Sequence, residues 1–443
     1  MPPLSLGEAV DTALRQHPRL ASLRAAEAAA VARMGQARAA WLPQVTTQTS
    51  LRQDYSYQTG IPEPSCEPGQ TSCPTRQPDL TSLRYSSQLT LSQLLYDFGR
   101  TSGRIAVAQA SARVARSDRQ TTQAQIVLGV IRAYYEALKA EALHEVAQQN
   151  LAQQAQRLRQ AESFVAIGTR PEIDALTART AHAQAELSAL TARNQVLIAR
   201  VQLLQAMGAT DPTWSLRPLV SAPVPPLPEE GREVEELLAA CLPLRPDYRA
   251  LYERVRQAEA QLQAARADFY PQIQIGGSAG LSGTVGGLSL GAVGGATRPD
   301  LPTAGQPGFA LQASLQITWA PFQGLVTVHA VREAEAQLLA ARADLEALRQ
   351  QVRSELQQAL LLVENSQRAL AAAESVLAQA EQQLAMAAGR YQAGVGNIIE
   401  LGDAQLGVMQ ARAQRVQADY DLQVARAGLR LQLGQLVPVE SGP

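Results

Sequence analysis

The sequence has few aromatic residues and no long apolar run. Aromatic residues make up 4% of the 443 residues, whereas alanine, glutamine and arginine abound. This composition is typical of long helices packed through small side chains and not of a thick globular core. No run of about 18 apolar residues occurs, so no transmembrane helix is expected. The net charge of −1 gives no indication of nucleic-acid binding.

Motifs of enzymes and of metal sites are also missing. The four histidines, His17, His144, His182 and His329, have no carboxylate or cysteine partners at the spacing of metal ligands. Neither a nucleophile elbow nor a phosphate-binding loop appears. We therefore expect no enzyme activity, no cofactor and no metal, and we expect the histidines on helix surfaces.

The beginning of the chain, MPPLSLGEAV, lacks the basic region and the apolar core of a signal peptide. Two interpretations stay open, a cytosolic protein or the mature form of an exported protein with a replacement Met. The strands described below favour the second interpretation.

Cysteine is scarce, with three residues in the chain. Cys66 and Cys73 lie in CEPGQTSC, a turn rich in Pro and Gly, and are either free thiols or a local disulfide. A disulfide requires an oxidising compartment, and we predict that it forms in an outward-facing loop. Cys241 lies in a helical stretch and is expected to be a small core residue.

An internal duplication is the strongest feature that the chain does contain. QARAAWLPQV at 36–45 returns as AARADFYPQI at 264–273, and HPRLASL at 17–23 returns with the same offset as RPDYRAL at 245–251. A sequence unit that occurs twice in tandem predicts pseudo-symmetry in the fold.

Each copy also contains a change of period. Apolar residues recur every three or four positions before Pro43 and Pro271, and they alternate after these prolines. A proline disfavours the helical conformation of the residue before it, so a helix is expected to end there and a strand to begin. Pro18 is expected to interrupt or kink the first helix.

The predicted organisation is two repeats of one plan, joined by a Pro-rich linker. The long helix after the second hairpin carries a seven-residue repeat of Leu338, Leu345, Val352 and Ala359, which predicts a coiled-coil seam. The segments are repeat 1 at 1–208 (helix 5–40, β-hairpin 43–96, helical hairpin 99–208), the linker 209–231, repeat 2 at 232–434 (helix 232–268, β-hairpin 271–320, helical hairpin 324–434) and the tail 435–443.

The predicted strands carry apolar residues on one face and small polar residues on the other. A half-exposed sheet covered by a helix is one interpretation, but no helix offers enough large apolar residues to cover it. The other interpretation is a lipid-facing barrel, since aromatic girdles flank membrane barrels and 11 of the 19 aromatic residues lie in or beside the strands. The expected membrane-interface residues are Trp41, Tyr55, Tyr57, Tyr85, Phe269, Tyr270, Phe309 and Trp319.

Four strands cannot close a barrel, and open sheet edges are not tolerated in lipid. Several chains must therefore combine. Two chains supply eight strands, whose inward side chains nearly fill the interior, whereas three chains supply twelve and leave room for water. The sequence favours three chains.

Several motifs in their order give the chain a resemblance to a known family. They are the A-x-x-x-P-Q-V/I junctions at 39–45 and 267–273, DFG at 97–99 and RYQAGVGNIIELGDAQ at 390–405. With the duplicated plan, they make nearly the whole chain resemble the TolC-like outer membrane efflux proteins. Some relatives carry a lipidated N-terminal cysteine, and this chain has none near its start.

The resemblance implies an α+β membrane protein with long antiparallel helical hairpins that form a periplasmic tunnel. It implies a homotrimer whose four strands per chain make a 12-stranded barrel in the outer membrane, and an equatorial region built from the linker and the C-terminus. It further implies a passive exit duct of a tripartite efflux or type I secretion system. The implied partners are a periplasmic adaptor and an inner-membrane pump.

The tips of the two helical hairpins are the expected functional sites. Gly168, Thr169, Gly394, Val395 and Gly396 are predicted to contact the adaptor. Acidic residues there are either solvated helix starts, which the helix macrodipole favours, or rings at the periplasmic mouth of a trimer. The gate candidates under the second interpretation are the acids Asp174, Glu400 and Asp403, with Arg170, Arg390 and Tyr391 as the residues that link them.

A second function stays open at this point. A periplasmic coiled-coil adaptor or scaffold also contains long helical hairpins, but it usually places one hairpin inside split globular β domains. Here two hairpins each follow a lipid-type pair of strands, which favours the duct.

Overall fold

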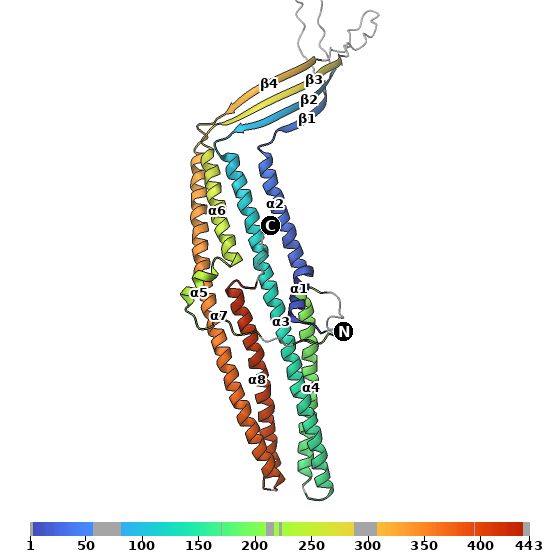
Figure 1. Cartoon of the computed structure of the whole chain (residues 1–443). Helices are drawn as coiled ribbons and strands as arrows, with labels where there is room; N and C mark the ends of the chain where they lie inside the picture. Colours follow the sequence, from blue (N-terminus) through green and yellow to red (C-terminus); the bar gives the residue numbers. More distant parts are fainter. Residues whose placement is uncertain are drawn as a thin grey trace, which may run out of the picture. The chain divides into compact units, whose positions relative to one another are not determined.

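The computed structural model describes residues 3–55, 81–169, 171–209, 217–220, 224–287, 308–393 and 395–436. Long helices and four strands dominate these residues (Figure 1), which confirms the predicted fold class. The elements are α1 (Leu6–Gln16), α2 (Pro18–Ala39), β1 (Gln44–Tyr55), β2 (Thr81–Tyr96), α3 (Arg100–Ala166), α4 (Glu172–Met207), α5 (Val234–Cys241), α6 (Pro246–Ala267), β3 (Gln272–Gly287), β4 (Gly308–Thr318), α7 (Val326–Gln392) and α8 (Ile398–Gln432).

The chain forms two compact units that do not coincide with the tandem repeats. Unit 1 comprises Met1–Val31, Ala110–Arg256 and Leu339–Pro443, and unit 2 comprises Ala32–Gln109 and Gln257–Leu338. Each unit therefore takes corresponding parts of both repeats. The cysteines Cys66 and Cys73 lie outside the described residues, so their predicted disulfide stays a prediction.

A proline divides the first helical segment, as expected for Pro18, and another divides the segment 232–268, which the sequence predicts as one helix. His17 has an extended backbone with ψ 121° and separates α1 from α2, because the residue before Pro18 is driven out of the helical conformation. The segment 232–268 is likewise two helices, and α6 begins at Pro246. Proline suits the first position of a helix, whose N–H has no partner in the helix.

The helical hairpins repeat closely between the two halves of the sequence. Helices α3 and α7 have 67 residues each, and α4 and α8 have 36 and 35 residues. At about 1.5 Å per residue, the longest helices extend roughly 100 Å. No helix in the described part of the chain is both long enough and apolar enough to cross a membrane.

The glycines that follow α4 and α8 show the duplication in atomic detail. Gly208 and Gly434 have φ of 66° and 72°, the left-handed conformation that ends many helices. A Cβ on Gly208 would lie 3.0 Å from the Cα of His17, and one on Gly434 would lie 3.1 Å from the carbonyl carbon of Leu244. Each glycine thus packs against the chain just before the proline that begins the next helix of its own repeat, Pro18 of α2 or Pro246 of α6.

Within unit 1 the predicted coiled-coil seam of α7 is buried at Val352 and Leu356 and half-buried at Leu345 and Ala359. Val352 and Leu356 are fully buried and Val363 is 2% exposed, against apolar residues of α8 and α5. The steps from Leu348 to Val352 and from Val352 to Leu356 are both of four residues, where a strict heptad alternates four with three. Such an insertion locally unwinds a coiled coil.

Unit 2 contains one antiparallel sheet in the order β1-β2-β3-β4, drawn side by side in Figure 1. Directly paired residues share a face of a sheet. The pairing aligns one residue of each strand in rows across the sheet. One row is Thr47–Leu89–Ala279–Leu311, and the neighbouring row on the other face is Gln48–Gln88–Gly280–Ala310.

The apolar face of this sheet is exposed in the single chain. Leu51, Leu311 and Phe309 are 72%, 78% and 72% exposed. β1 and β4 stand at the two ends of the strand order, so within the described residues each pairs with one neighbour. The sheet therefore has an uncovered apolar face and two open edges.

The DFG segment forms the junction between β2 and α3. Asp97 is buried and accepts hydrogen bonds from the backbone N–H of Thr101 (2.7 Å) and Gly99 (3.3 Å), which caps the start of α3. Phe98 has φ 55°, which is rare for a bulky residue. Its ring stacks on Tyr270 at 5.1 Å, and this contact holds the strained turn.

Five of the predicted interface aromatics are exposed around the sheet. They are Trp41, Phe269, Tyr270, Phe309 and Trp319. Tyr85 is half-buried and covers Gly283, where a Cβ would lie 2.3 Å from its hydroxyl oxygen. Tyr57 and the side chain of Tyr55 lie outside the described residues. The place of these aromatics at a membrane interface stays a prediction.

Candidate functional site: the helical hairpin tips of unit 1

The first hairpin reverses direction at Gly168. This residue has φ +81°, where a side chain would be strained. Its N–H donates to the carbonyl of Val165 (3.0 Å), and the N–H of Thr169 donates to the carbonyl of Phe164 (3.0 Å). Both bonds occupy carbonyls that the end of α3 leaves free.

The second hairpin reverses direction at Gly396 for a different reason. The N–H groups of Val395 and Gly396 both donate to the carbonyl of Arg390, at 3.1 and 3.0 Å. A Cβ on Gly396 would lie 2.8 Å from the backbone nitrogen of Tyr391, so the turn has no room for a side chain. Asn397 then caps α8 by accepting from the N–H of Ile399 (3.2 Å).

The structure brings together two of the predicted gate residues. Arg390 Nη1 lies 3.1 Å from Glu400 Oε1, with both side chains exposed, and this ion pair joins α7 to α8 within one hairpin. Asp403 is exposed one turn further along α8, and Tyr391 packs against a small buried cluster that includes Leu401. The pair therefore holds the two helices of the second tip, α7 and α8, together.

The remaining gate candidates are not joined to that pair. Asp174 belongs to the other hairpin, in the first turn of α4, and is 8% exposed. A carboxylate there is favoured by the helix macrodipole, which also explains the acid without a gate. Arg170 and Gly394 lie outside the described residues. The roles of the gate and adaptor-contact residues stay predictions.

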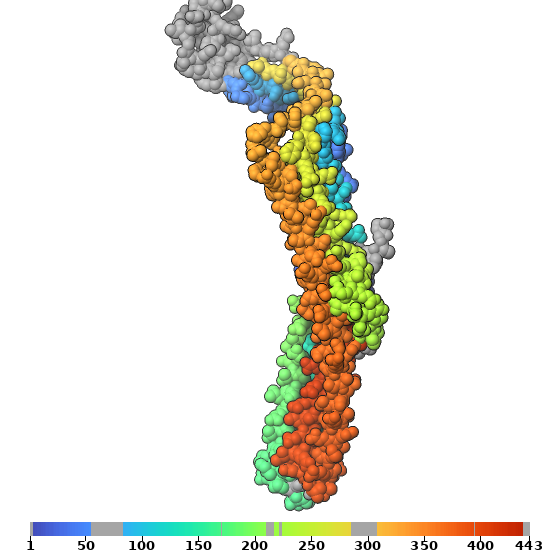
Figure 2. Space-filling model, turned by 90° about the vertical axis from the view of Figure 1, so that its left-hand side faces the viewer, coloured from blue at the N-terminus to red at the C-terminus, as the bar shows by residue number. Residues whose placement is uncertain are grey.

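A cavity of about 880 Å³ lies between the two hairpins near their tips, lined by residues of α3, α4, α7 and α8. In Figure 2, α4 (green) and the α7–α8 hairpin (orange to red) form the surface at this end of unit 1. Gln154 Nε2 donates to Gln405 Oε1 (3.2 Å), which links α3 to α8 beside the cavity.

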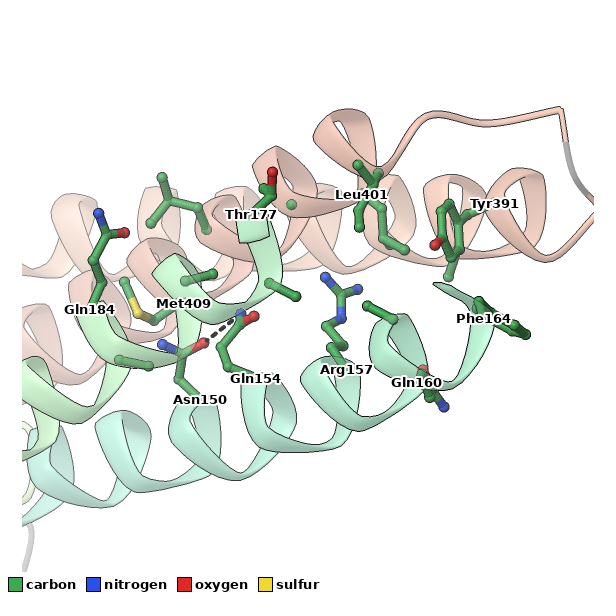
Figure 3. A pocket seen from close by; sticks show the side chains of 18 of the residues that line it. Asn150, Gln154, Arg157, Gln160, Phe164, Thr177, Gln184, Tyr391, Leu401 and Met409 are labelled. Carbon is green, nitrogen blue, oxygen red and sulfur yellow. Dashed lines mark hydrogen bonds between the residues drawn. The ribbon is translucent and has the colours of Figure 1, made fainter. Parts of the chain in front are cut away.

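Arg157 extends from α3 toward the α7–α8 hairpin, between Gln154 and Tyr391 (Figure 3). Burial lowers the pKa of this guanidinium to about 10, although nearby Tyr391 acts in the opposite direction. The side chain is therefore still a cation at neutral pH, but one that has lost much of its hydration.

Sequence reasoning missed Arg157 because no motif surrounds it. A signal was nevertheless available in the spacing. Asn150, Gln154, Arg157, Ala161 and Phe164 all line the cavity and are separated by steps of four and three. This is the spacing of a coiled-coil seam, which normally carries apolar residues. Where the residues of such a seam become polar, the facing helices do not pack directly against each other.

A second group of polar contacts in unit 1 joins the linker to α7 and α8 and is here named the linker cluster: Val224, Glu230, Gln367, Gln423 and Arg426. Arg426 Nε lies 3.0 Å from Glu230 Oε1, and these side chains are only 11% and 14% exposed. Gln367 donates to the other carboxylate oxygen (2.5 Å), and Gln423 accepts from the N–H of Val224 (2.6 Å). The linker is thereby fixed to α7 and α8.

Two further contacts fix neighbouring segments of unit 1. The hydroxyl oxygen of Tyr134 lies 2.8 Å from the carbonyls of Leu4 and Val220 and accepts from the N–H of Val220 (3.0 Å). Burial raises the pKa of Tyr134, so the hydroxyl keeps its proton. Burial alone would lower the pKa of Arg245, but its ion pairs with Asp247 and Glu355 outweigh this and raise it.

In the ranges that the structure describes, no group of three or more His, Cys, Asp or Glu side chains is arranged to hold a metal ion. The candidate site therefore consists of helix tips, ion pairs and a cavity.

Comparisons with known proteins agree with this architecture. The family model described as "Outer membrane efflux protein" matches residues 9–209 and 237–435. Protein CyaE of Bordetella pertussis is 28% identical over 442 residues, which cover 98% of this chain and 84% of that protein.

Solved structures of outer-membrane proteins are also similar. The outer-membrane channel OprN matches with a TM-score of 0.77 and 23% identity, over 98% of this chain and 91% of its own. The outer membrane protein VceC of Vibrio cholerae matches with a TM-score of 0.75 and 19% identity, over 97% of this chain and 96% of its own. These matches lend no support to the adaptor alternative.

Proposed function

Because this chain belongs to the outer membrane efflux protein family and is an exit duct of the outer membrane, we propose that three copies assemble into one passive channel. In this assembly β4 of each copy pairs with β1 of the next, and the three sheets close a barrel of twelve strands. The helical hairpins of the three copies together enclose the periplasmic tunnel.

The observation that carries this proposal is the uncovered apolar face of the sheet. A face with Leu311 78% exposed is unfavourable in water and suits lipid. Lipid in turn does not tolerate the open edges of β1 and β4, so each edge requires another copy. Three copies favour an open lumen, since eight strands from two copies leave an interior that side chains nearly fill.

The test is the native mass of the full chain in a mild detergent. We expect three times the chain mass of 47.4 kDa. Replacing Leu315 on the lipid-facing side by Arg should impair assembly into membranes, whereas Gln316→Arg on the opposite face should not. A stable monomer or dimer would refute the barrel count and the tunnel together.

We place the periplasmic gate of this channel at the hairpin tips. The Arg390–Glu400 pair supports this, because it ties the two helices of one tip through exposed groups that are individually weak. Glu400, Asp403 and Asp174 form acidic rings in the trimer, and Arg170 and Tyr391 complete the closed state. A periplasmic adaptor releases this state by contacting the tips around Gly168 and Gly396, and an inner-membrane pump supplies the cargo.

A further inference from the structure

The cavity between the two hairpins has the size of a small-molecule site. Its volume of about 880 Å³ lies within the range of roughly 300–1,000 Å³ that such sites occupy. Four helices of one chain line it, so its walls do not depend on a neighbouring copy. The Gln154–Gln405 hydrogen bond joins two of these helices and limits how far they separate.

Arg157 is an uncompensated cation in this cavity. Other arginines of the same hairpins have carboxylate partners: Arg179 pairs with Glu162 at 2.9 Å, and Arg412 pairs with Glu381 at 3.0 Å. Among the residues that the structure describes, none supplies a carboxylate within salt-bridge distance of Arg157. A desolvated cation without a counter-charge is unfavourable, so an anion that enters the cavity gains a strong charge-assisted hydrogen bond.

The rest of the lining is divided between polar and apolar groups. Asn150 and Gln154 offer hydrogen bonds on one side of Arg157, and Phe164, Leu401 and Met409 offer apolar surface (Figure 3). This combination fits a molecule with one anionic group and a short apolar body. It does not fit a strongly hydrated inorganic ion, which would leave the apolar surface uncovered.

We propose that the cavity binds a small amphiphile with a single anionic head, which Arg157 holds while the apolar body contacts Phe164, Leu401 and Met409. A helix of a partner protein is too large, because a helix with side chains is about 10 Å across and Gln154 bridges to Gln405 at 3.2 Å. A bound amphiphile touches both hairpins and therefore holds the tips in their present arrangement.

The site needs only the two hairpins of one chain, so binding is measurable whether or not the protein conducts. The experiment is calorimetric titration of octyl sulfate, below its micelle concentration, into the full chain in lipid nanodiscs, with empty nanodiscs as the blank. We expect one saturable site per chain, and octan-1-ol, which has the same body without the charge, should bind at least about tenfold more weakly.

Matched variants separate the charge from the cavity. Arg157→Gln should weaken octyl sulfate binding by at least about tenfold, whereas Arg159→Gln, on an exposed face of the same helix, should bind like the parent. Arg157→Lys keeps the charge and should retain most of the affinity. Ala181→Leu keeps the charge but narrows the cavity, so it should also weaken binding.

Equal affinity of the parent and Arg157→Gln would overturn the proposal, as would heat that matches the empty nanodiscs. A Glu-rich helical peptide that binds and is not displaced by octyl sulfate would assign the cavity to a protein partner and would also overturn it. Circular dichroism of every variant should show the parent's helix content, which excludes loss of fold as the cause.

Discussion

In the linker cluster an arginine–glutamate pair of unit 1 is largely shielded from water, whereas at the second hairpin tip the same kind of pair is exposed. Arg426 and Glu230 are 11% and 14% exposed and have further hydrogen bonds, while Arg390 and Glu400 are 60% and 42% exposed. A buried charge that loses its partner is costly, and an exposed one is readily hydrated. The linker cluster is therefore suited to hold helices in place, and the tip is suited to open.

The largest effect expected from this comparison is that of Arg426→Ala. Removal of the arginine leaves Glu230 as an uncompensated charge in a nearly dry site, so we expect a loss of about 3 kcal/mol in the free energy of unfolding. Chemical denaturation followed by circular dichroism measures it. The matched control is Arg412→Ala, whose pair with Glu381 is exposed at 36% and 48%, and its loss should stay below about 1 kcal/mol.

A second substitution tests whether the loss of stability in Arg426→Ala comes from the charge of Glu230. Arg426→Ala combined with Glu230→Gln should recover part of the stability, because a neutral amide is less costly to bury. If the double variant is no more stable than Arg426→Ala, burial of charge does not distinguish the linker cluster from the tip.

The next effect is that of Tyr134→Phe, which removes one buried hydroxyl. The N–H of Val220 then loses the nearer of its two acceptors and keeps the carbonyl of Leu4 (3.3 Å), and the carbonyl of Leu4 loses the hydroxyl donor. We expect a loss of about 1–2 kcal/mol in the free energy of unfolding. Tyr252→Phe, at a side chain that is 45% exposed, is the control and should change little. Equal losses in the two variants would mean that the hydroxyl of Tyr134 does not tie these segments together.

A smaller and local effect is expected at the second tip. Gly396→Ala forces a Cβ to within 2.8 Å of the nitrogen of Tyr391, and we expect it to destabilise the turn by about 1–2 kcal/mol. Hydrogen exchange of the amides around Val395 should become faster. Gly407→Ala lies inside α8 with open space around the new methyl group, and should stabilise the helix by about 0.5–1 kcal/mol. Unchanged hydrogen exchange in Gly396→Ala would show that the turn accommodates the added methyl group without loss of stability.

The smallest effect on stability is expected for Arg390→Ala, below about 1 kcal/mol in the free energy of unfolding. Its effect on function should be larger, because the pair with Glu400 holds α7 and α8 together at the tip that forms the proposed gate. Single-channel conductance in planar bilayers should rise, and Glu400→Ala with Asp403→Ala should reduce the preference for cations. If both variants conduct like the parent, the gate lies at other residues and the duct remains.

Much of the fold could be predicted because it depends on local rules. Pro43 and Pro271 mark the places where helices give way to strands, and the seven-residue spacing of Leu345 and Val352 marks the seam of α7. The same locality explains the break expected at Pro18, because a proline acts on the backbone of the single residue before it. It also explains an error, since the segment 232–268, predicted as a single helix, is divided before Pro246.

The sequence by itself determined the periodicity, the duplication and the glycine turns, since each is decided within a few residues or by direct repetition. The tertiary structure alone decided which polar groups meet. Arg426 and Glu230 are 196 positions apart, and Gln154 and Gln405 are 251 apart. The first pairing depends on where the linker packs on α8 and the second on how α3 packs near α8, and a shift of one residue turns a helical side chain by about 100°. For the same reason Arg157 is an ordinary arginine in the sequence and becomes the cation of a cavity only in the folded protein.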